Sequence, residues 1–102
     1  MAQSKRQNVL QLLGLIRRAN QLVTGEEFVL RAVQKEQARY VFVARDSSKT
    51  THKLFLDKCE SHKINVSFEF SRAEISIAIG TQRSVVAVTG VGFSKKIAQL
   101  LD

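Results

Sequence analysis

A short apolar segment, a tight turn and the start of a helix are encoded by Val23-Thr24-Gly25-Glu26-Glu27-Phe28-Val29-Leu30-Arg31-Ala32-Val33. Thr24 followed three residues later by Glu27 is a capping-box pattern, so we expect a helix to begin here. The backbone amides at such a helix start, with the positive end of the helix dipole, attract phosphates and other polarised groups. Along this helix we expect one face to pack through Val29, Leu30 and Val33, and the opposite face to present Glu27, Arg31 and Lys35 to a partner.

The composition indicates one globular domain, residues 1–102, with a large excess of positive charge. Hydrophobic residues make up 44% and charged residues 25% of the chain, which is enough for one core and does not suggest disorder. Sixteen Lys and Arg against nine Asp and Glu give a formal net charge of +7 and a pI near 10.1. This charge favours polyanionic partners, nucleic acid before a membrane surface.

The sequence also predicts a cytoplasmic location. The one cysteine, Cys59, cannot form an internal disulfide, which is consistent with a reducing cytosol. No apolar run approaches the length of a membrane span, and the polar start of the chain leads into no signal-type segment. We therefore expect no membrane partner.

The first helix is predicted over about 5–19 from the helical spacing of Val9, Leu12, Leu13 and Ile16. Arg17 and Arg18 close this helix. Two interpretations of this pair stay open: cations are favourable at the negative end of a helix dipole, and they also suit a nucleic-acid contact.

Beyond this point strands and helices are predicted to alternate. Strands are expected at 22–23, 39–44, 66–70 and 84–89, because these runs are rich in β-branched and aromatic residues. Helices are expected from about 48 to 62, from a second capping box at Ser71 and Glu74 to Gly80, and over the last residues of the chain. This order predicts an α/β domain with helices on both faces of a mixed, mostly parallel central sheet.

Nothing in the sequence predicts catalysis, a cofactor or a metal site. His52 and His62 have no carboxylates or cysteines at ligand spacing, and Cys59 falls on the apolar side of its helix. The neighbours Glu26-Glu27 cannot face each other as an acid and base pair. Gly90-Val91-Gly92 lacks the third glycine and the lysine of a phosphate-binding loop. We therefore expect a protein that is not an enzyme and takes no small-molecule substrate.

Binding of a polyanion is better supported. Arg31 and Lys35 share a helix face that starts at the Gly25 turn, Arg45 follows the next strand, and Arg83 lies in a polar loop before the last strand. Loops at the ends of parallel strands gather along one edge, where ligands of open α/β folds usually bind. An ion pair between Glu27 and Arg31 is an equally open interpretation of that pair, and one residue can serve both roles.

The order and spacing of four segments resemble a known family across essentially the whole chain. These segments are Leu13-Gly14-Leu15-Ile16-Arg17-Arg18-Ala19, Val23-Thr24-Gly25-Glu26-Glu27, Val41-Phe42-Val43-Ala44-Arg45-Asp46 and Val88-Thr89-Gly90-Val91-Gly92-Phe93. The chain is similar to the ribosomal protein family that includes the archaeal L-seven-Ae and L-thirty-e proteins, and most to its small bacterial YlxQ-like members. The resemblance implies a three-layer α/β/α sandwich and RNA binding, in the best-known members to sharply bent kink-turns.

In that family the start of the second helix holds the RNA through the pattern Gly-x-Asn-Glu-x-x-Lys. Gly25 and Arg31 match this pattern in kind, whereas Glu27 stands at the Asn position and Phe28 at the Glu position. The family's second contact, an apolar loop before the last strand, corresponds to the polar residues 80–84. The resemblance therefore implies that attraction to phosphates is kept while the reading of base edges is changed.

Together these observations predict a non-catalytic, monomeric RNA-binding protein associated with ribosomal or other structured RNA. Two alternatives are a module that docks on a ribosomal or ribosome-assembly protein, and a separate RNA-binding subunit of an RNA-modifying enzyme. Clustering of the arginines on one edge would favour RNA, and an exposed apolar patch would favour docking. The predicted RNA-binding residues are Gly25, Glu26, Glu27, Arg31, Lys35, Arg45 and Arg83.

Overall fold

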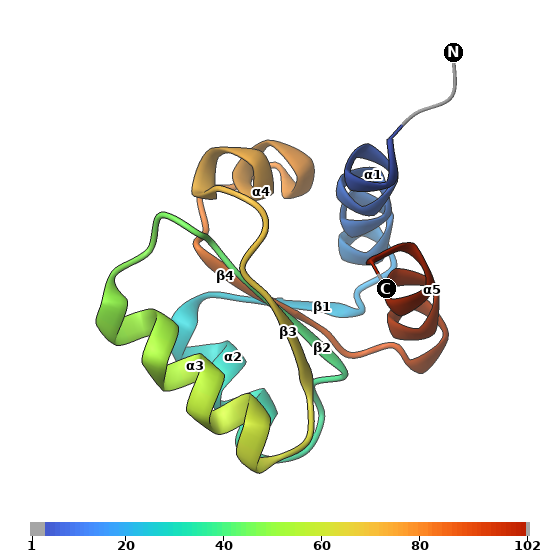
Figure 1. The fold of residues 1–102 in the computed structure, drawn as a ribbon. Coiled ribbons are helices and arrows are strands. Elements are labelled where there is room, and N and C mark those ends of the chain that lie inside the picture. Colours follow the sequence, from blue (N-terminus) through green and yellow to red (C-terminus); the bar gives the residue numbers. More distant parts are fainter. Residues whose placement is uncertain (1–3, 102) are drawn as a thin grey trace.

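The computed structural model describes residues 4–101, which form five helices and four strands (Figure 1). None of these helices is both long enough and apolar enough to cross a membrane. In chain order the elements are α1 (Lys5–Arg18), β1 (Leu22–Thr24), α2 (Glu26–Gln34), β2 (Tyr40–Val43), α3 (Lys49–Ser61), β3 (Asn65–Ser67), α4 (Arg72–Ile79), β4 (Val85–Val88) and α5 (Val91–Leu101).

The four strands form one mixed sheet in the order β1-β4-β2-β3. The β2–β3 pair is parallel, whereas β4 is antiparallel to both β1 and β2. Three of the four strands therefore run in one direction, as expected for a mixed, mostly parallel sheet. Because the reversed strand β4 lies inside the sheet, two of the three strand pairs are antiparallel. The direction of β4 follows from α4, which begins and ends beside the same end of β2. The chain therefore enters β4 at the end of the sheet where it left β3. The bonds that show this are Arg45 N to Phe70 O, 2.9 Å, and Ala44 N to Ser84 O, 2.7 Å.

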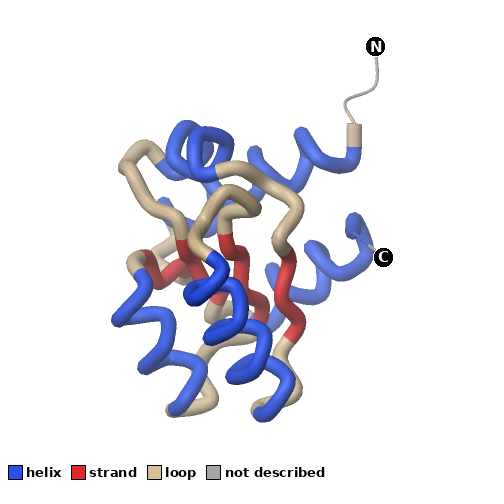
Figure 2. Tube along the Cα trace, turned by 60° about the vertical axis from the view of Figure 1, so that its left-hand side comes forward, coloured by secondary structure: helices blue, strands red, loops and turns tan. Residues whose placement is uncertain are grey.

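Helices cover both faces of the sheet, which confirms the three-layer α/β/α sandwich (Figure 2). Alternate residues of β2 point to opposite faces. Tyr40 and Phe42 pack with α1, α4 and α5, and Val41 and Val43 pack with α2 and α3. All four residues of β2 and of β4 are buried, as their unbroken apolar runs predict.

Local signals place most helix ends. Ser71 and Glu74 form the predicted capping box of α4, and Gly80 ends this helix in the left-handed region at φ 80°.

The third strand ends at Ser67, three residues earlier than predicted. Phe68 and Phe70 instead belong to a loop. Phe70 is buried in the core, and Phe68 packs against His52 with a ring-centroid distance of 4.8 Å.

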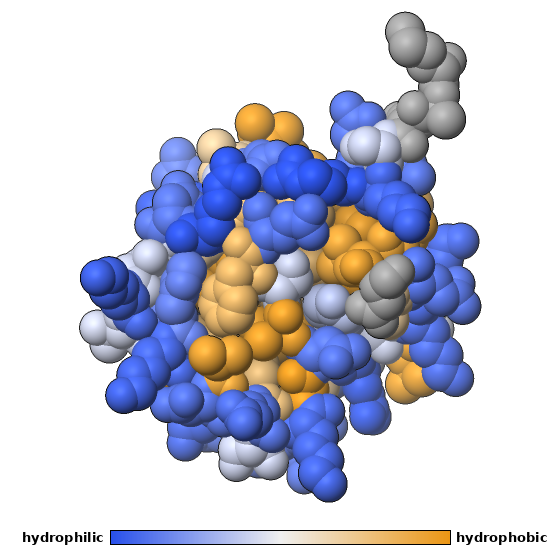
Figure 3. Space-filling model, viewed as in Figure 1, coloured by the Kyte–Doolittle hydropathy of each residue, from blue (hydrophilic) through white to orange (hydrophobic). Residues whose placement is uncertain are grey.

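The surface seen in Figure 3 is hydrophilic over most of its area, and hydrophobic residues reach it over β3 and beside α1. The partly buried hydrophobic residues of these elements include Val66 of β3 and Leu10 and Leu12 of α1. Polar side chains therefore make up most of the surface presented to a partner on this face.

Candidate nucleic-acid interface

Four connecting segments meet at one end of the sheet, where β1, β2 and β3 end and β4 begins. Gly25 N donates to Val85 O at 2.9 Å, which joins the end of β1 to the start of β4. The bonds that Ala44 and Arg45 donate to the Ser84 and Phe70 carbonyls add the ends of β2 and of the β3–α4 loop. We call this region, residues 25, 44–46, 68–71 and 80–84, the loop edge.

The helix α2 starts at the loop edge, and its N-cap is Gly25 rather than the predicted Thr24. Thr24 remains in β1, where it pairs with Val86, so its side chain does not cap the helix. Gly25 has φ 98°, a conformation that favours glycine, and it supplies no side-chain hydrogen bond. The first helical bond, Val29 N to Gly25 O, is 2.9 Å long. The amides of residues 26–28, which precede that bond, point along the helix axis into the loop edge without a capping side chain.

Phe28 and Arg83 flank Gly25. A Cβ atom added to Gly25 would lie 3.8 Å from Cδ2 of Phe28 and 4.0 Å from Nε of Arg83. Phe28 is 60% exposed, and the Cζ atom of Arg31 lies 5.9 Å from the centroid of its ring. Arg31 also donates to Oε1 of Glu27 at 2.8 Å. We call Gly25, Glu27, Phe28, Arg31 and Arg83 the Gly25 cluster.

The two arginines of this cluster are held weakly. The Glu27 and Arg31 side chains are 74% and 60% exposed, so their predicted ion pair is present but contributes only about a few tenths of a kcal/mol. Arg83 Nη1 donates to the Gln82 carbonyl at 2.7 Å, and no ion pair between described residues includes Arg83. Both guanidinium groups can therefore exchange these bonds for a phosphate.

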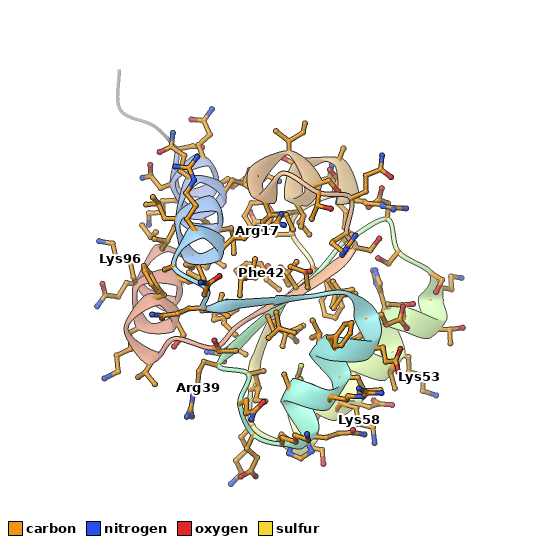
Figure 4. All side chains as sticks on the ribbon, turned by 180° about the vertical axis from the view of Figure 1, so that it is seen from behind. Arg17, Arg39, Phe42, Lys53, Lys58 and Lys96 are labelled. Atoms are coloured by element: carbon orange, nitrogen blue, oxygen red, sulfur yellow. The ribbon has the colours of Figure 1, made fainter. Side chains whose placement is uncertain are left out.

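The loop that carries Arg83 is anchored to α4. Arg83 N donates to Ser76 Oγ at 3.1 Å, and that hydroxyl donates back to Arg83 O at 3.3 Å. At the end of α4, Arg17 donates to the Ile79 carbonyl (Figure 4), so this arginine binds the end of a neighbouring helix. Beside the loop lies a groove of about 630 Å³, lined by Asp46, Arg72, Ala73, Ser76, Ile77, Gly80, Thr81 and Gln82.

Arg45 also lies at the loop edge, but it faces α4. Its Nη1 donates to Glu69 O at 3.3 Å and lies 4.0 Å from Glu74 Oε1. Arg6 of α1 holds Glu74 with two bonds of 3.1 Å and holds the Glu69 carboxylate at 3.2 Å. The hydrogen bond from Arg6, followed by the bond from the Ser71 backbone, lowers the pKa of Glu74 to about 2. Arg45 therefore belongs in part to a network that joins α1, α4 and the loop edge.

The predicted site residues are thus only partly brought together. Gly25, Glu27, Arg31 and Arg83 form one cluster, and the exposed Glu26 is the first residue of α2 beside it. Lys35 is the C-cap of α2 and lies about 15 Å along the helix axis from Gly25. In the sequence, Phe28 stands out only as a departure from the family pattern. Its position three residues before Arg31, on the same helix face, is the signal that places it in the cluster.

The cysteine and the two histidines, which could in principle take part in catalysis, are buried or lie near groups of the fold. Cys59 is fully buried, and burial raises the pKa of its thiol to about 11. His52 Nε2 lies 2.8 Å from the Ala44 carbonyl oxygen, and His62 Nδ1 lies 3.9 Å from Glu36 Oε1. Over residues 4–101, no three His, Cys, Asp or Glu side chains are grouped so that they could hold a metal ion.

Comparison with solved structures places the fold among known proteins. A Bacillus halodurans protein of unknown function superposes with a TM-score of 0.87 at 45% identity, over 90% of this chain and 94% of the other. The Giardia lamblia 15.5kD RNA binding protein superposes with a TM-score of 0.80 at 15% identity, over 99% of this chain and 93% of the other. At 15% identity, the similarity to the Giardia protein shows a shared fold alone.

Sequence comparison identifies the family. The chain is 38% identical over 102 residues to RNA-binding protein YlxQ of Enterococcus faecium, covering 100% of this chain and 99% of the relative. It is 40% identical over 92 residues to RNA-binding protein YlxQ of Bacillus subtilis, covering 89% and 92%. The model of the ribosomal protein L7Ae/L30e/S12e/Gadd45 family matches residues 7–98. With this match over nearly the whole chain, and the α/β/α sandwich that carries it, the chain belongs to the ribosomal protein L7Ae/L30e/S12e/Gadd45 family.

Proposed function

We propose that this protein is a non-catalytic RNA-binding protein that holds structured RNA at the loop edge, with the Gly25 cluster at the centre of the contact. The observation that carries the proposal is the start of α2, which has no side-chain cap and has Arg83 beside Gly25 and Arg31 over the Phe28 ring. Further support comes from the net charge of +7 and from two relatives, at 38% and 40% identity, that are named RNA-binding proteins.

In this proposal phosphates provide most of the affinity. One phosphate lies at the start of α2, where the amides of residues 26–28 and the helix dipole favour negative charge. Arg31 and Arg83 hold the flanking phosphates as charge-assisted donors. Arg45 and Lys35, exposed at the rim and at the far end of α2, extend the positive field along the RNA.

The carboxylates at the start of α2 have a separate role in the proposal. Glu26 and Glu27 accept hydrogen bonds from base or ribose donors and repel misplaced phosphates. Together with Phe28 and the polar loop 80–84, they differ from the pattern of kink-turn binders, so the proposed readout of bases differs as well. A kink-turn is the first RNA to test because it is the bent, partly unpaired structure that the family resemblance implies.

The test is a fluorescence titration of a standard kink-turn duplex and a matched straight duplex, each at two salt concentrations. The matched variants are Arg83→Ala at the loop edge and Arg39→Ala at the opposite end of the sheet, where Figure 4 shows Arg39 remote from α4. We expect tighter binding to the kinked RNA, and loss of affinity in Arg83→Ala but not in Arg39→Ala. Equal affinity of both variants and the unchanged protein would reject the loop edge as the RNA site.

A second candidate function is docking on a protein partner, and one observation favours it. Ile77 on the outer side of α4 is 82% exposed and lines two neighbouring grooves, one with Gly80 and the other with Leu10. This role predicts that Ile77→Asp abolishes association with the partner while the affinity for RNA stays unchanged. If docking were the only function, neither duplex would bind in a way that depends on Arg83.

A further inference from the structure

Phe28 is a large aromatic side chain that the fold leaves in solvent. The core phenylalanines Phe42, Phe55 and Phe70 are at most 1% exposed, whereas Phe28 is 60% exposed. The packing of α2 is provided by Val29, Ala32 and Val33, which are buried. The ring of Phe28 is therefore not needed to attach α2 to the sheet.

The surroundings of this ring are cationic and open. Gly25 has no side chain to cover the ring, and a Cβ atom there would lie 3.8 Å from Cδ2 of Phe28. Arg31 lies over the ring at 5.9 Å from the centroid, a cation–π distance. Arg83 lies beside the same glycine, with its Nε 4.0 Å from that Cβ position. The ring thus presents an apolar plane near two guanidinium groups, at the end of a helix that attracts anions.

This combination matches one chemical group. An unpaired nucleotide offers an apolar aromatic face together with phosphates on either side, and unstacked bases of structured RNA commonly stack on aromatic side chains. A base inside a continuous duplex has both faces covered by its neighbours, so it cannot use such a surface. An apolar protein partner fits poorly, because Arg31 lies over the ring, Glu27 pairs with Arg31, and Arg83 lies beside the neighbouring Gly25.

We propose that Phe28 is a stacking platform for one unpaired nucleobase of the bound RNA, with Arg31 and Arg83 holding the phosphates that flank that nucleotide. The inference rests on the proposed function and names the feature of RNA that the loop edge selects. Stacking tolerates all four bases. The platform therefore selects unpaired RNA over continuous duplex, with little preference for sequence.

The experiment uses three RNAs of equal length: a duplex with a three-nucleotide bulge, the same duplex with abasic bulge nucleotides, and a continuous duplex. The abasic RNA keeps the phosphates and removes only the bases. Each is titrated with the unchanged protein, Phe28→Ala, Phe28→Trp, Arg83→Ala and a control, Val91→Ala. Val91 is also exposed, at 50%, but it begins α5 at the other end of β4. Thermal unfolding confirms that each variant is folded.

The platform predicts that Phe28→Ala binds the bulged RNA roughly 5- to 150-fold more weakly, the range expected when alanine replaces an aromatic side chain on which one base stacks. It predicts that Phe28→Trp and Val91→Ala bind like the unchanged protein. For the abasic RNA, Phe28→Ala should have no effect. The salt dependence of binding should stay the same in Phe28→Ala, because no phosphate contact is removed.

Three results would overturn the platform. If Phe28→Ala binds the bulged RNA normally while Arg83→Ala binds it weakly, the loop edge binds RNA without stacking, and the proposed function stands. If Phe28→Ala loses equal affinity for the bulged and the abasic RNA, Phe28 does not contact a base. If no RNA binds, or Arg83→Ala has no effect on any of them, the proposed function fails and the platform fails with it.

Discussion

The guanidinium of Arg83 lies beside Gly25, with Nε 4.0 Å from the position that a Cβ atom would take on this glycine. Gly25 is the N-cap of α2, and Arg83 lies in the loop before β4, so this proximity joins two segments that are far apart in the chain. The bond from Gly25 N to Val85 O fixes this relationship through the backbone. A positive side chain is thereby held at the end of a helix that already favours anions.

Replacing Gly25 with alanine should weaken both folding and RNA binding. The backbone at φ 98° and ψ 142° is a conformation that L-residues avoid, so we expect a loss of about 1 to 3 kcal/mol in the free energy of unfolding. Gly92→Ala is the matched control, because an added Cβ there meets no atom within 4 Å. Urea denaturation measures the free energy of unfolding of both variants. Equal stability of Gly25→Ala and the unchanged protein would show that this backbone conformation is not required.

Arg83→Ala should weaken RNA binding and make its salt dependence shallower by about one phosphate contact. For one lost contact the slope of log K against log salt falls by roughly 0.7 to 0.9. Arg31→Ala should behave similarly, since its ion pair with Glu27 is exposed and weak. Titrations at four or more salt concentrations measure the slope. A variant that is folded and keeps the full slope is not a phosphate contact.

The stability of the fold should fall below about pH 4 because of Glu74. The pKa of Glu74 in the folded protein is lowered to about 2, first by the hydrogen bond from Arg6, while in the unfolded chain it is near its ordinary value. A lowered pKa stabilises the folded state above the unfolded pKa, and this stabilisation is lost as the pH falls from about 4 to 2. After solvent screening we expect a contribution on the order of 1 kcal/mol.

Glu74→Gln tests this directly, because it removes the charge and keeps the length of the side chain. The free energy of unfolding of this variant, measured by urea denaturation from pH 2 to 6, should vary less with pH than that of the unchanged protein. Glu60→Gln, an exposed change on α3, serves as the control and should keep the original profile. Identical profiles for Glu74→Gln and the control would remove the Arg6–Glu74 pair as the source.

Cys59 should be unreactive until the protein unfolds. Its side chain is fully buried and its thiol pKa is raised to about 11, so little thiolate forms at pH 8 and reagents cannot reach it. A colorimetric thiol reagent should react slowly with the native protein and quickly above the midpoint of denaturation. Rapid reaction in the absence of denaturant would contradict the burial of Cys59 in the α2–α3 side of the core.

Much of the fold could be predicted from local patterns. The unbroken apolar runs Tyr40–Val43 and Val85–Val88 are strands covered on both faces, and the pattern of Ser71 and Glu74 starts α4 as expected. The direction of β4 within the sheet could not be predicted, because it depends on where α4 returns the chain. Likewise Thr24 carries a capping signal, but its pairing with Val86 keeps it in β1 and leaves the N-cap to Gly25.

The candidate site was predictable to a smaller extent. The loops that follow parallel strands could be expected to meet, but Arg83 lies in the loop before β4. It reaches Gly25 because β4 is antiparallel to β1. The direction of Arg45 could not be predicted, because its partners, the Glu69 carbonyl and Glu74, come from a distant segment. Arg31 and Lys35 are four residues apart, which is a helical spacing. This spacing does not show that α2 ends at Gln34 and that Lys35 lies far from the Gly25 turn.

The most direct test of RNA binding at the loop edge is to record amide chemical shifts of the ¹⁵N-labelled protein while kink-turn or bulged RNA is added. Binding at this edge predicts that the largest shifts come from residues 25–28 and from Arg83, and that residues 88–89 at the other end of β4 shift little. Largest shifts at the far end of the sheet or on the outer side of α4, with residues 25–28 unchanged, would contradict it.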